Sequence, residues 1–449
     1  MAAPWSRYRF KKSVLTNGVR VVTENHPNAV AASVGFFIDK GTRDEQPDEA
    51  GLAHFVEHMV FKSTAHRTAF QISKDMEEVG ADINAYTSRE TTSYVAFGLS
   101  EHLERYVDVL SDVVTRPKFA RRDVDMERDV VIQEIRSSED MLEDCVFDRH
   151  FEEAFRGTSL ALPILGSIKS IESISRERVL KFYRRAYLDR NLVVAAAGRV
   201  DHDELCGYLE KYLSPMKSAR AQSGKASSRA RQETAPETAT ELALPQARGF
   251  SKVIKRRAEQ AHILIGAPSP GFRDDRRFEA MVLNGILGGG LTSRLYQQIR
   301  ENRGLAYAVY SQLYSFVDAG TMLMYAATEP TKAPDALSVA LKEMAKLRQK
   351  GFSKEEMTMV QTQVRASTII GSDDPESRMQ SLGINELVFG RYRPIGEVLE
   401  EFERVKPEAV QDLAETALRP EVLGITLMGP LPEKPMREWI EKSLKRKRG

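Results

Sequence analysis

The chain has 449 residues, and its 65 Lys and Arg against 64 Asp and Glu give a formal net charge of +1. This balance offers no electrostatic basis for binding nucleic acid or an anionic membrane surface. Hydrophobic residues make up 42% of the chain, enough for a large core, yet no apolar run is long enough to span a membrane. Two cysteines exclude a disulfide framework, and the N-terminal segment lacks the apolar stretch of a signal peptide. We therefore expect a soluble, cytoplasmic protein.

The middle of the chain differs in composition from the rest. Residues 218–246 are rich in Ala, Ser, Arg, Thr and Glu and poor in large apolar side chains. Such a segment buries too little surface to offset the entropy of ordering it, which is typical of a linker. The sequence thus predicts a domain over residues 1–217, a linker over residues 218–246 and a domain over residues 247–449.

The two halves have related sequences of elements. AASVGFFIDKGTRDEQPDEAGLAHFVEH, which begins at Ala31, and AHILIGAPSPGFRDDRRFEAMVLNGILGG, which begins at Ala261, both indicate a strand, a polar turn and a helix. Each half also ends in a strand followed by a helix. We expect a duplicated α+β domain, each copy with a mixed or antiparallel sheet flanked by helices. Seven of the eight histidines lie in the first half, so histidine chemistry would fall there.

The most specific motif of the chain is His54-Phe55-Val56-Glu57-His58. On a helix, residues at i, i+3 and i+4 share a face, so the two imidazoles and the carboxylate project together. Two histidines one turn apart can bind a zinc ion, and the carboxylate between them can reach a metal-bound water. The order of the motif is that of the inverted zincins. Two solvated histidines beside an exposed acid are the alternative, which the apolar neighbours Leu52 and Met59 disfavour.

A catalytic zinc ion needs a third protein ligand, and residues 122–136 are the best source of one. The apolar residues Met126, Val130 and Ile135 predict a helix there. Glu127 and Glu134 are seven residues apart and lie on one face of that helix. Taken alone, the pair is typical of a solvated acidic face. Beside an incomplete two-histidine site, the pair becomes a candidate metal ligand and a supporting carboxylate.

At this point the chain resembles the pitrilysin/insulinase family of zinc peptidases, and in particular the branch of mitochondrial processing peptidase and its bacterial single-chain relatives. The resemblance rests on HFVEHMVFKST, on the gap from His58 to Glu134 and on the Glu127/Glu134 pair. It implies that His54, His58 and Glu134 bind one Zn²⁺ per chain, with Glu127 supporting the site. Glu57 would be the general base. It also implies a clamshell-like arrangement of the two domains around a chamber.

The same resemblance covers a predicted substrate strand. Asn84-Ala85-Tyr86, within NAYTSRETTSY, resembles the family's active-site edge strand, along which an extended peptide pairs its backbone by strand addition. Without the zinc motif, a β-hairpin with a polar turn would explain the same residues.

A second matching segment lies in the other half. Arg300 is followed seven residues later by Tyr307, which resembles the pair that the family's second half delivers to the zinc site. A guanidinium and a phenol there could stabilise the developing oxyanion of the substrate. Arg303 and Tyr310 repeat the spacing and are the alternates. On spacing alone, a surface arginine and a half-buried strand tyrosine would explain either pair.

These features predict a zinc-dependent endopeptidase for extended, unfolded or presequence-like peptides. The resemblance implies a homodimer, or a heterodimer with a metal-free homologue. Two alternatives remain: a non-catalytic core subunit of the same fold, as in respiratory complexes, and one subunit of a heteromeric processing peptidase. The intact set of His54, Glu57, His58 and Glu134 argues against a scaffold, which has no physical need for all four.

Overall fold

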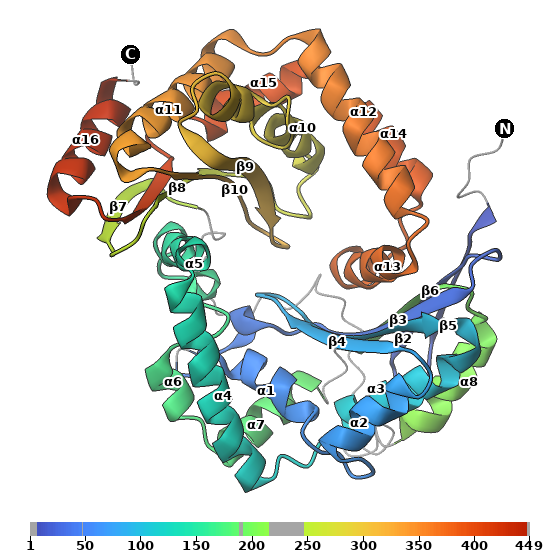
Figure 1. Cartoon of the computed structure of the whole chain (residues 1–449). Coiled ribbons are helices and arrows are strands. Elements are labelled where there is room, and N and C mark those ends of the chain that lie inside the picture. Colours follow the sequence, from blue (N-terminus) through green and yellow to red (C-terminus); the bar gives the residue numbers. More distant parts are fainter. Residues whose placement is uncertain (1–6, 47, 188–191, 215–246, 447–449) are drawn as a thin grey trace, which may run out of the picture. The chain divides into compact units, whose positions relative to one another are not determined.

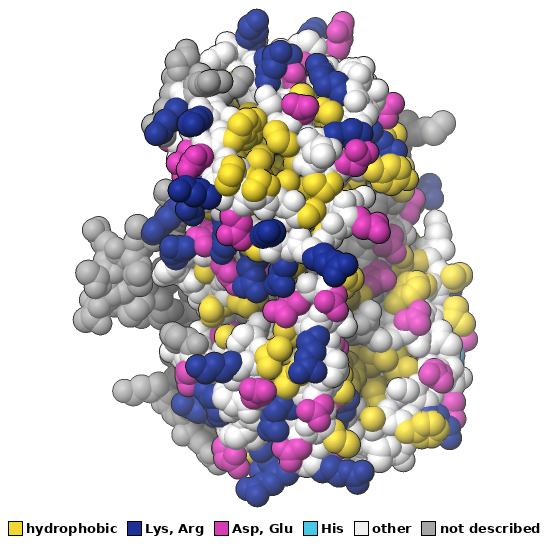
Figure 2. Space-filling model, turned by 60° about the vertical axis from the view of Figure 1, so that its left-hand side comes forward, with side chains coloured by type: hydrophobic (Ala, Val, Ile, Leu, Met, Phe, Trp, Pro, Cys, Tyr) yellow, Lys and Arg dark blue, Asp and Glu magenta, His cyan; other side chains and the backbone are white. Residues whose placement is uncertain are grey.

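The computed structural model describes residues 7–46, 48–187, 192–214 and 247–446, and the chain divides into two compact units (Figure 1). The first unit comprises Met1–Ile135, Leu162–Thr240 and Thr368–Ile395, and the second comprises Arg136–Ala161, Glu241–Ser367 and Gly396–Gly449. The predicted linker, residues 218–246, lies outside the described residues. Within the described ranges, no helix is both long enough and apolar enough to cross a bilayer. Basic and acidic side chains are interspersed on the face shown in Figure 2.

The first unit is built on a six-stranded sheet with the order β1-β2-β6-β3-β5-β4. Its strands are β1 (Arg9–Val14), β2 (Arg20–Asn25), β3 (Ala31–Ile38), β4 (Asp82–Thr87), β5 (Thr92–Leu99) and β6 (Leu192–Gly198). The pair β2–β6 is parallel and the other pairs are antiparallel. The sheet is therefore mixed, as predicted.

Helices cover both faces of this sheet. Its helices are α1 (Leu52–Val60), α2 (Ala69–Glu77), α3 (Leu103–Thr115), α4 (Arg121–Asp140, which continues into the second unit), α6 (Ile168–Glu172), α7 (Arg176–Tyr187), α8 (His202–Tyr212) and α13 (Pro375–Phe389). Val34 and Phe36 of β3 share a core with α1, α3, α7 and α8. Phe37 points to the opposite face and packs with Met379 and Leu382 of α13. Because neither face is left to solvent at the centre of the sheet, β3 and β6 are apolar runs without polar alternation, whereas the edge strands β1 and β4 are polar.

The second unit is built on a five-stranded sheet with the order β7-β11-β8-β10-β9. Its strands are β7 (Phe250–Lys255), β8 (Ala261–Pro268), β9 (Ala306–Ser315), β10 (Gly320–Thr328) and β11 (Gly424–Gly429). Its helices are α5 (Leu142–Ala154), α10 (Arg277–Leu287), α11 (Ala333–Lys350), α12 (Lys354–Gly371, which ends in the first unit), α14 (Ile395–Glu403), α15 (Pro407–Ala417) and α16 (Glu433–Arg446). One face of the sheet shares a core with α10, α11, α15 and α16, and the other face shares a core with α5.

Short helical turns complete both units. The 3₁₀ turns are η2 (Thr42–Asp44), η3 (Ser100–His102), η4 (Ser159–Ala161) and η7 (Pro330–Lys332), and η6 (Tyr296–Glu301) is a π-helical turn.

The two units repeat one topology, which confirms the predicted duplication. The parallel pair β2–β6 corresponds to β7–β11, and β3, β5 and β4 correspond in order and direction to β8, β10 and β9. The helices α5 and α13 occupy equivalent places in the chain order of their halves. Each nevertheless packs on the sheet formed by the other half, α13 on β2, β3 and β6 and α5 on β8 and β11. The predicted domains 1–217 and 247–449 follow the halves of the chain, whereas the compact units exchange these helices.

Candidate active site

Helix α1 carries the His-x-x-Glu-His motif and begins at a fixed backbone position. Gly51 precedes the helix with φ 88°, and a Cβ there would lie 2.7 Å from the carbonyl oxygen of Leu165, so only glycine fits. The carboxylate of Glu45 accepts hydrogen bonds from the backbone N–H of Ala53 (2.7 Å) and of Gly51 (3.1 Å). Burial raises the pKa of Glu45 to about 8. The start of the helix is therefore held by groups outside the motif.

The apolar side of α1 is buried in the core of the first unit. Its buried residues are Leu52, Ala53, Phe55, Val56, Met59 and Val60. His54, Glu57 and His58 share the remaining face and are partly exposed. The sequence therefore fixes which side chains face away from the core, because any rotation of α1 would bury charge and expose Phe55.

Three predicted ligand side chains converge on this face. The Nε2 atoms of His54 and His58 lie 3.9 Å and 3.6 Å from Oε2 of Glu134, which α4 contributes. One ligand atom from each residue can be chosen so that all lie within 4.8 Å of one another. Among the described residues, no other group of three His, Cys, Asp or Glu side chains comes as close together. Two imidazole nitrogens and one carboxylate oxygen form a donor set that suits zinc.

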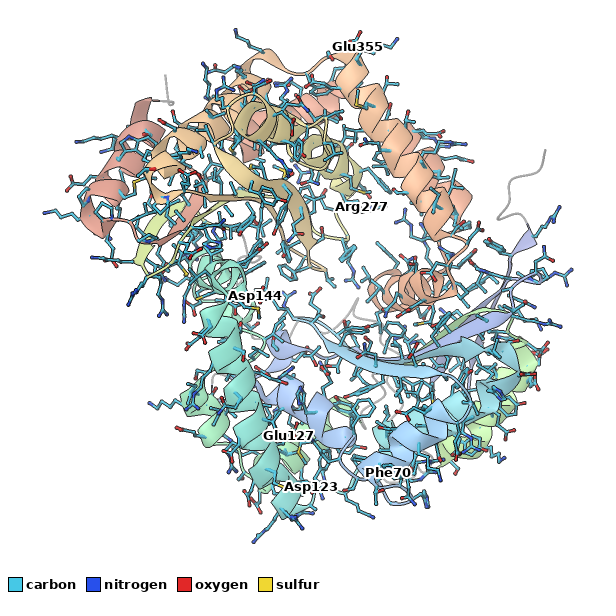
Figure 3. All side chains as sticks on the ribbon, in the orientation of Figure 1. Phe70, Asp123, Glu127, Asp144, Arg277 and Glu355 are labelled. Carbon is cyan, nitrogen blue, oxygen red and sulfur yellow. The ribbon has the colours of Figure 1, made fainter. Side chains whose placement is uncertain are left out.

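Glu127 orients one of the histidines. It lies on α4 (Figure 3), seven residues before Glu134. It is 2% exposed, and its Oε1 is 2.8 Å from Nδ1 of His58. Its Oε2 forms an ion pair with Lys62. Burial opposes the charge of Glu127, but the bonds from His58 and Lys62 outweigh burial and lower its pKa. With Nδ1 engaged by Glu127, Nε2 of His58 is left to face Glu134.

The pKa values of the two histidines shift in opposite directions. Burial, and then the charge of His58, lower the pKa of His54 to about 4. Burial also works against protonation of His58, but its hydrogen bond to Glu127 and the charge of Glu134 raise the pKa overall. His54 is thus held neutral, which is the form that binds a metal ion. Its Nδ1 is buried without a hydrogen-bond partner.

Glu57 points to the same region and is held by a threonine. The hydroxyl of Thr87, the last residue of β4, donates a hydrogen bond to Oε2 of Glu57. Burial raises the pKa of Glu57, and the bond from Thr87 opposes this effect only in part. A carboxylate with a raised pKa is better suited to take up and release a proton.

Sequence reasoning missed Thr87 and Lys62 as parts of this arrangement. Lys62 follows His58 by four residues, so helical spacing could have placed it near Glu127. Thr87 is separated from Glu57 by 30 residues, and no local pattern marks that contact.

The predicted substrate residues lie on an edge strand. In the sheet of the first unit, β4 pairs with β5, and no strand from the described part of the chain pairs with its other side. Asn84 and Tyr86 are exposed, and Asn84 Nδ2 donates to the Tyr86 hydroxyl at 2.9 Å. The N–H of Ala85 donates to Oδ1 of Asn84 at 2.8 Å. The geometry is that of a strand open to further pairing, and substrate binding there stays a prediction.

Arg300 and Tyr307 lie together in the second unit. The guanidinium carbon of Arg300, in η6, is 4.8 Å from the ring centroid of Tyr307, which is 78% exposed on β9. The alternates are engaged differently: Arg303 donates to Gln298, and the Tyr310 hydroxyl donates to Glu143 at 2.7 Å. Arg300 and Tyr307 therefore contact each other, whereas Arg303 and Tyr310 each bind other residues. Its action at the cluster of the first unit stays a prediction.

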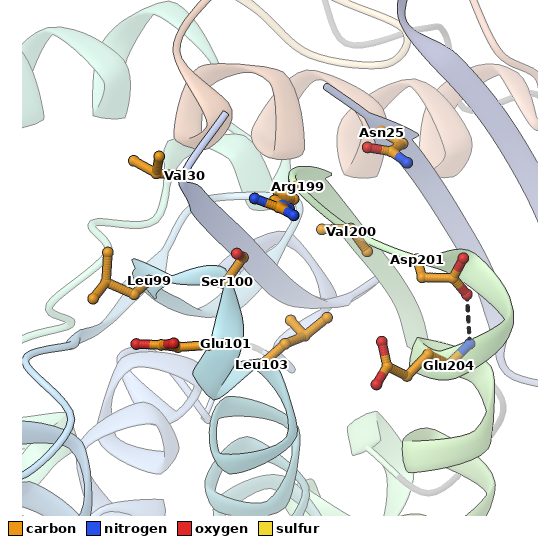
Figure 4. A pocket seen from close by; sticks show the side chains of 10 residues that line it. All are labelled: Asn25, Val30, Leu99, Ser100, Glu101, Leu103, Arg199, Val200, Asp201 and Glu204. Atoms are coloured by element: carbon orange, nitrogen blue, oxygen red, sulfur yellow. Dashed lines mark hydrogen bonds between the residues drawn. The ribbon is translucent and has the colours of Figure 1, made fainter. Parts of the chain in front are cut away.

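A cavity of about 580 Å³ lies elsewhere in the first unit and contains none of the predicted site residues. The cavity lies at the C-terminal end of β5, and Leu99 and Ser100 are among the residues that line it (Figure 4). Asp201 in its wall caps α8 by accepting a bond from the Glu204 N–H at 2.9 Å. His54, Glu57, His58 and Glu134 thus do not line this cavity.

The repeated fold and the His-x-x-Glu-His helix match the sequence pattern of the inverted zincins. The chain belongs to the insulinase family, peptidase family M16. Residues 20–168 match the family model described as Insulinase (Peptidase family M16), and residues 173–364 match the model described as Peptidase M16 inactive domain. The family inferred from the motifs is thereby confirmed.

Individual relatives agree with this membership. An uncharacterized zinc protease of Mycobacterium leprae is 37% identical over 425 residues, which cover 94% of this chain and 92% of the relative. A protease from Helicobacter pylori has a similar solved structure, with a TM-score of 0.83 and 19% identity over 94% of this chain and 99% of the other. A chain of complex III2 from Candida albicans has a TM-score of 0.78 and 21% identity over 96% of this chain and 99% of the other. The two structures show likeness of fold.

Proposed function

We propose that the protein is a zinc-dependent endopeptidase that hydrolyses extended peptides, including unfolded and presequence-like segments. The observation that carries the proposal is the convergence of His54, His58 and Glu134 around one point beside Glu57. Membership of the M16 family and relatives named zinc proteases support it. We assign the chain to the branch of mitochondrial processing peptidase on the motif evidence.

The donor set fits Zn²⁺, and His54, His58 and Glu134 would hold it. When bound, zinc supplies Lewis-acid chemistry, which polarises a substrate carbonyl and makes a water more acidic. Glu127 keeps the His58 ring oriented through Nδ1. Glu57 takes a proton from the attacking water and returns it to the leaving amine. Burial raises the pKa of Glu57, which makes the carboxylate a stronger base for the first of these transfers.

The substrate would pair with β4 as an additional strand. Strand addition uses backbone hydrogen bonds and needs an extended segment, so folded proteins would be poor substrates. The paired stretch would consist of Asn84, Ala85 and Tyr86. The next residue of the strand is Thr87, whose hydroxyl bonds to Glu57. Arg300 and Tyr307 would stabilise the oxyanion, as the family resemblance implies.

We propose a homodimer as the working assembly, with a heterodimer containing a metal-free homologue as the alternative. Light scattering of the purified chain, alone and during turnover, separates these states. The cytoplasmic location expected from the sequence stays a prediction.

Glu57→Gln tests the proposed activity. We expect the wild type to contain about one zinc per chain and to cleave a quenched, extended peptide, whereas Glu57→Gln keeps zinc and loses roughly a hundredfold to ten-thousandfold in kcat. Glu77→Gln, which changes an exposed acid on α2, serves as the control and should match the wild type. A wild type that neither holds zinc nor cleaves the peptide would favour a non-catalytic core subunit, and a Glu57→Gln variant of unchanged rate would refute the proposed zinc mechanism with Glu57 as base.

A further inference from the structure

Thr87 occupies the junction between the edge strand and the helix that carries the motif. It is the last residue of β4, and β4 packs against α1. Its hydroxyl donates a hydrogen bond to Oε2 of Glu57. Among the described residues, Thr87 provides the one side-chain hydrogen bond recorded for the Glu57 carboxylate. The orientation of the carboxylate therefore depends on where Thr87 is held.

The hairpin after Thr87 is held by backbone hydrogen bonds from the turn that contains Gly41. The backbone N–H groups of Thr42 and Arg43 donate to the carbonyls of Ser88 (3.2 Å) and Arg89 (2.7 Å). A Cβ on Gly41 would lie 2.4 Å from the Ser88 carbonyl oxygen, so the two turns approach as closely as glycine allows. The position of Thr87 is thus set by η2 and the turn before it, and the same stretch contains Glu45, which anchors the start of α1.

We propose that Thr87 is a positioning residue for Glu57, an inference that rests on the proposed peptidase function. By holding Oε2, the Thr87 hydroxyl turns Oε1 toward the water that the carboxylate must deprotonate. Because threonine is branched at Cβ, its χ1 angle is restricted and the direction of the hydroxyl is set by the backbone of β4. Peptide pairing along β4 and alignment of the base are therefore coupled through a single residue.

Two replacements separate the hydroxyl from the shape of the side chain. Thr87→Val keeps the volume and removes the donor, and Thr87→Ser keeps the donor and removes the methyl group. We expect Thr87→Val to lower kcat about tenfold to a hundredfold, the range for losing a hydrogen bond to a charged group. KM should stay within about twofold and the zinc content unchanged. Thr87→Ser should recover kcat to within about threefold of the wild type.

Thr91→Val is the matched control. Thr91 lies in the same hairpin, and its hydroxyl is 3.0 Å from that of Ser88, with no bond to Glu57. We expect Thr91→Val to keep the wild-type kcat. Equal losses in the serine and valine variants of Thr87, or an equal loss in Thr91→Val, would show that hairpin order rather than the hydroxyl sets the rate, and would overturn the inference.

The result for Glu57→Gln distinguishes a failure of the proposed peptidase function from a failure of the positioning role of Thr87. If Glu57→Gln is inactive while Thr87→Val is as fast as the wild type, the peptidase stands and the role of Thr87 is wrong. If Glu57→Gln cleaves at the wild-type rate, the proposed function fails, and the role of Thr87 fails with it. Loss of zinc from Thr87→Val would assign Thr87 to the integrity of the metal site and would also overturn the positioning role.

Discussion

A buried ion pair ties α13 to the sheet of the first unit, and Glu24→Gln tests how much it contributes. Glu24 on β2 is fully buried and accepts a two-pronged bond from Arg378 of α13, with Nε at 2.8 Å. The Tyr392 hydroxyl donates to its Oε2 at 2.7 Å, and Nε2 of His26 lies 2.9 Å from its Oε1. Replacing Glu24 by glutamine keeps the shape and removes the charge that all three partners face.

The magnitude follows from the pKa of Glu24. Burial raises this pKa, but the bonds from His26, Arg378 and Tyr392 outweigh burial and lower it from 4.5 to about 2. A depressed carboxyl pKa stabilises the folded state above the unfolded pKa, and this stabilisation is lost as pH falls through the folded pKa. A shift of this size corresponds to about 3 kcal/mol at pH 7. Because the unfolded carboxyl protonates first, roughly 1.5 kcal/mol remains at pH 3.

Urea unfolding followed by circular dichroism at pH 7 and at pH 3 measures the difference between Glu24→Gln and the wild type. Hydrogen exchange of the α13 amides shows whether the loss is located there. The control is Glu104→Gln, which removes an exposed ion pair with Lys211 and should cost less than about 1 kcal/mol. A Glu24→Gln variant as stable as the wild type at pH 7, or a difference that does not shrink at pH 3, would refute the reasoning.

Two further changes probe the metal site and the helix exchange. Glu127→Gln removes the charge that holds Nδ1 of His58, and we expect zinc affinity, measured by competition with a chelator, to fall about tenfold to a hundredfold; unchanged affinity would contradict the orienting role. Phe37→Ala opens a cavity under α13 and should lower the free energy of unfolding by about 3–5 kcal/mol, whereas Phe70→Ala, at a residue 74% exposed, should change it by less than about 0.5 kcal/mol. Equal costs would show that α13 does not depend on this core.

The sequence allowed the duplicated α+β fold and the family to be predicted because both depend on local patterns. A strand-turn-helix order repeats in each half, and His54, Glu57 and His58 lie within one helical turn of each other. Glu134 could be selected only through the family resemblance, since two acids on one helix face are common at protein surfaces. The structure places it beside the histidines.

The exchange of α5 and α13 could not be read from the sequence. Met379 and Leu382 have the spacing of any amphipathic helix, and their partner Phe37 precedes them by more than 300 residues in the chain. Each sheet has one face covered by the other helices of its unit and a second apolar face that α5 or α13 covers. Which helix covers which second face depends on tertiary packing and not on a local pattern. For the same reason Thr87 was missed, because its bond to Glu57 depends on the register of a hairpin rather than on any motif.

The second half of the chain differs from the first by more than its lack of a His-x-x-Glu-His motif. Helix α10 occupies the place of α1 in the repeat, and α12 occupies the place of α4. A Cβ on Gly285 of α10 would lie 2.5 Å from Val360 of α12, and one on Gly288 would lie 2.6 Å from the Ser311 hydroxyl of β9. In the first unit, by contrast, His54 and His58 of α1 face Glu134 of α4. Because even a Cβ on Gly285 would overlap Val360, a histidine at that position would clash with α12.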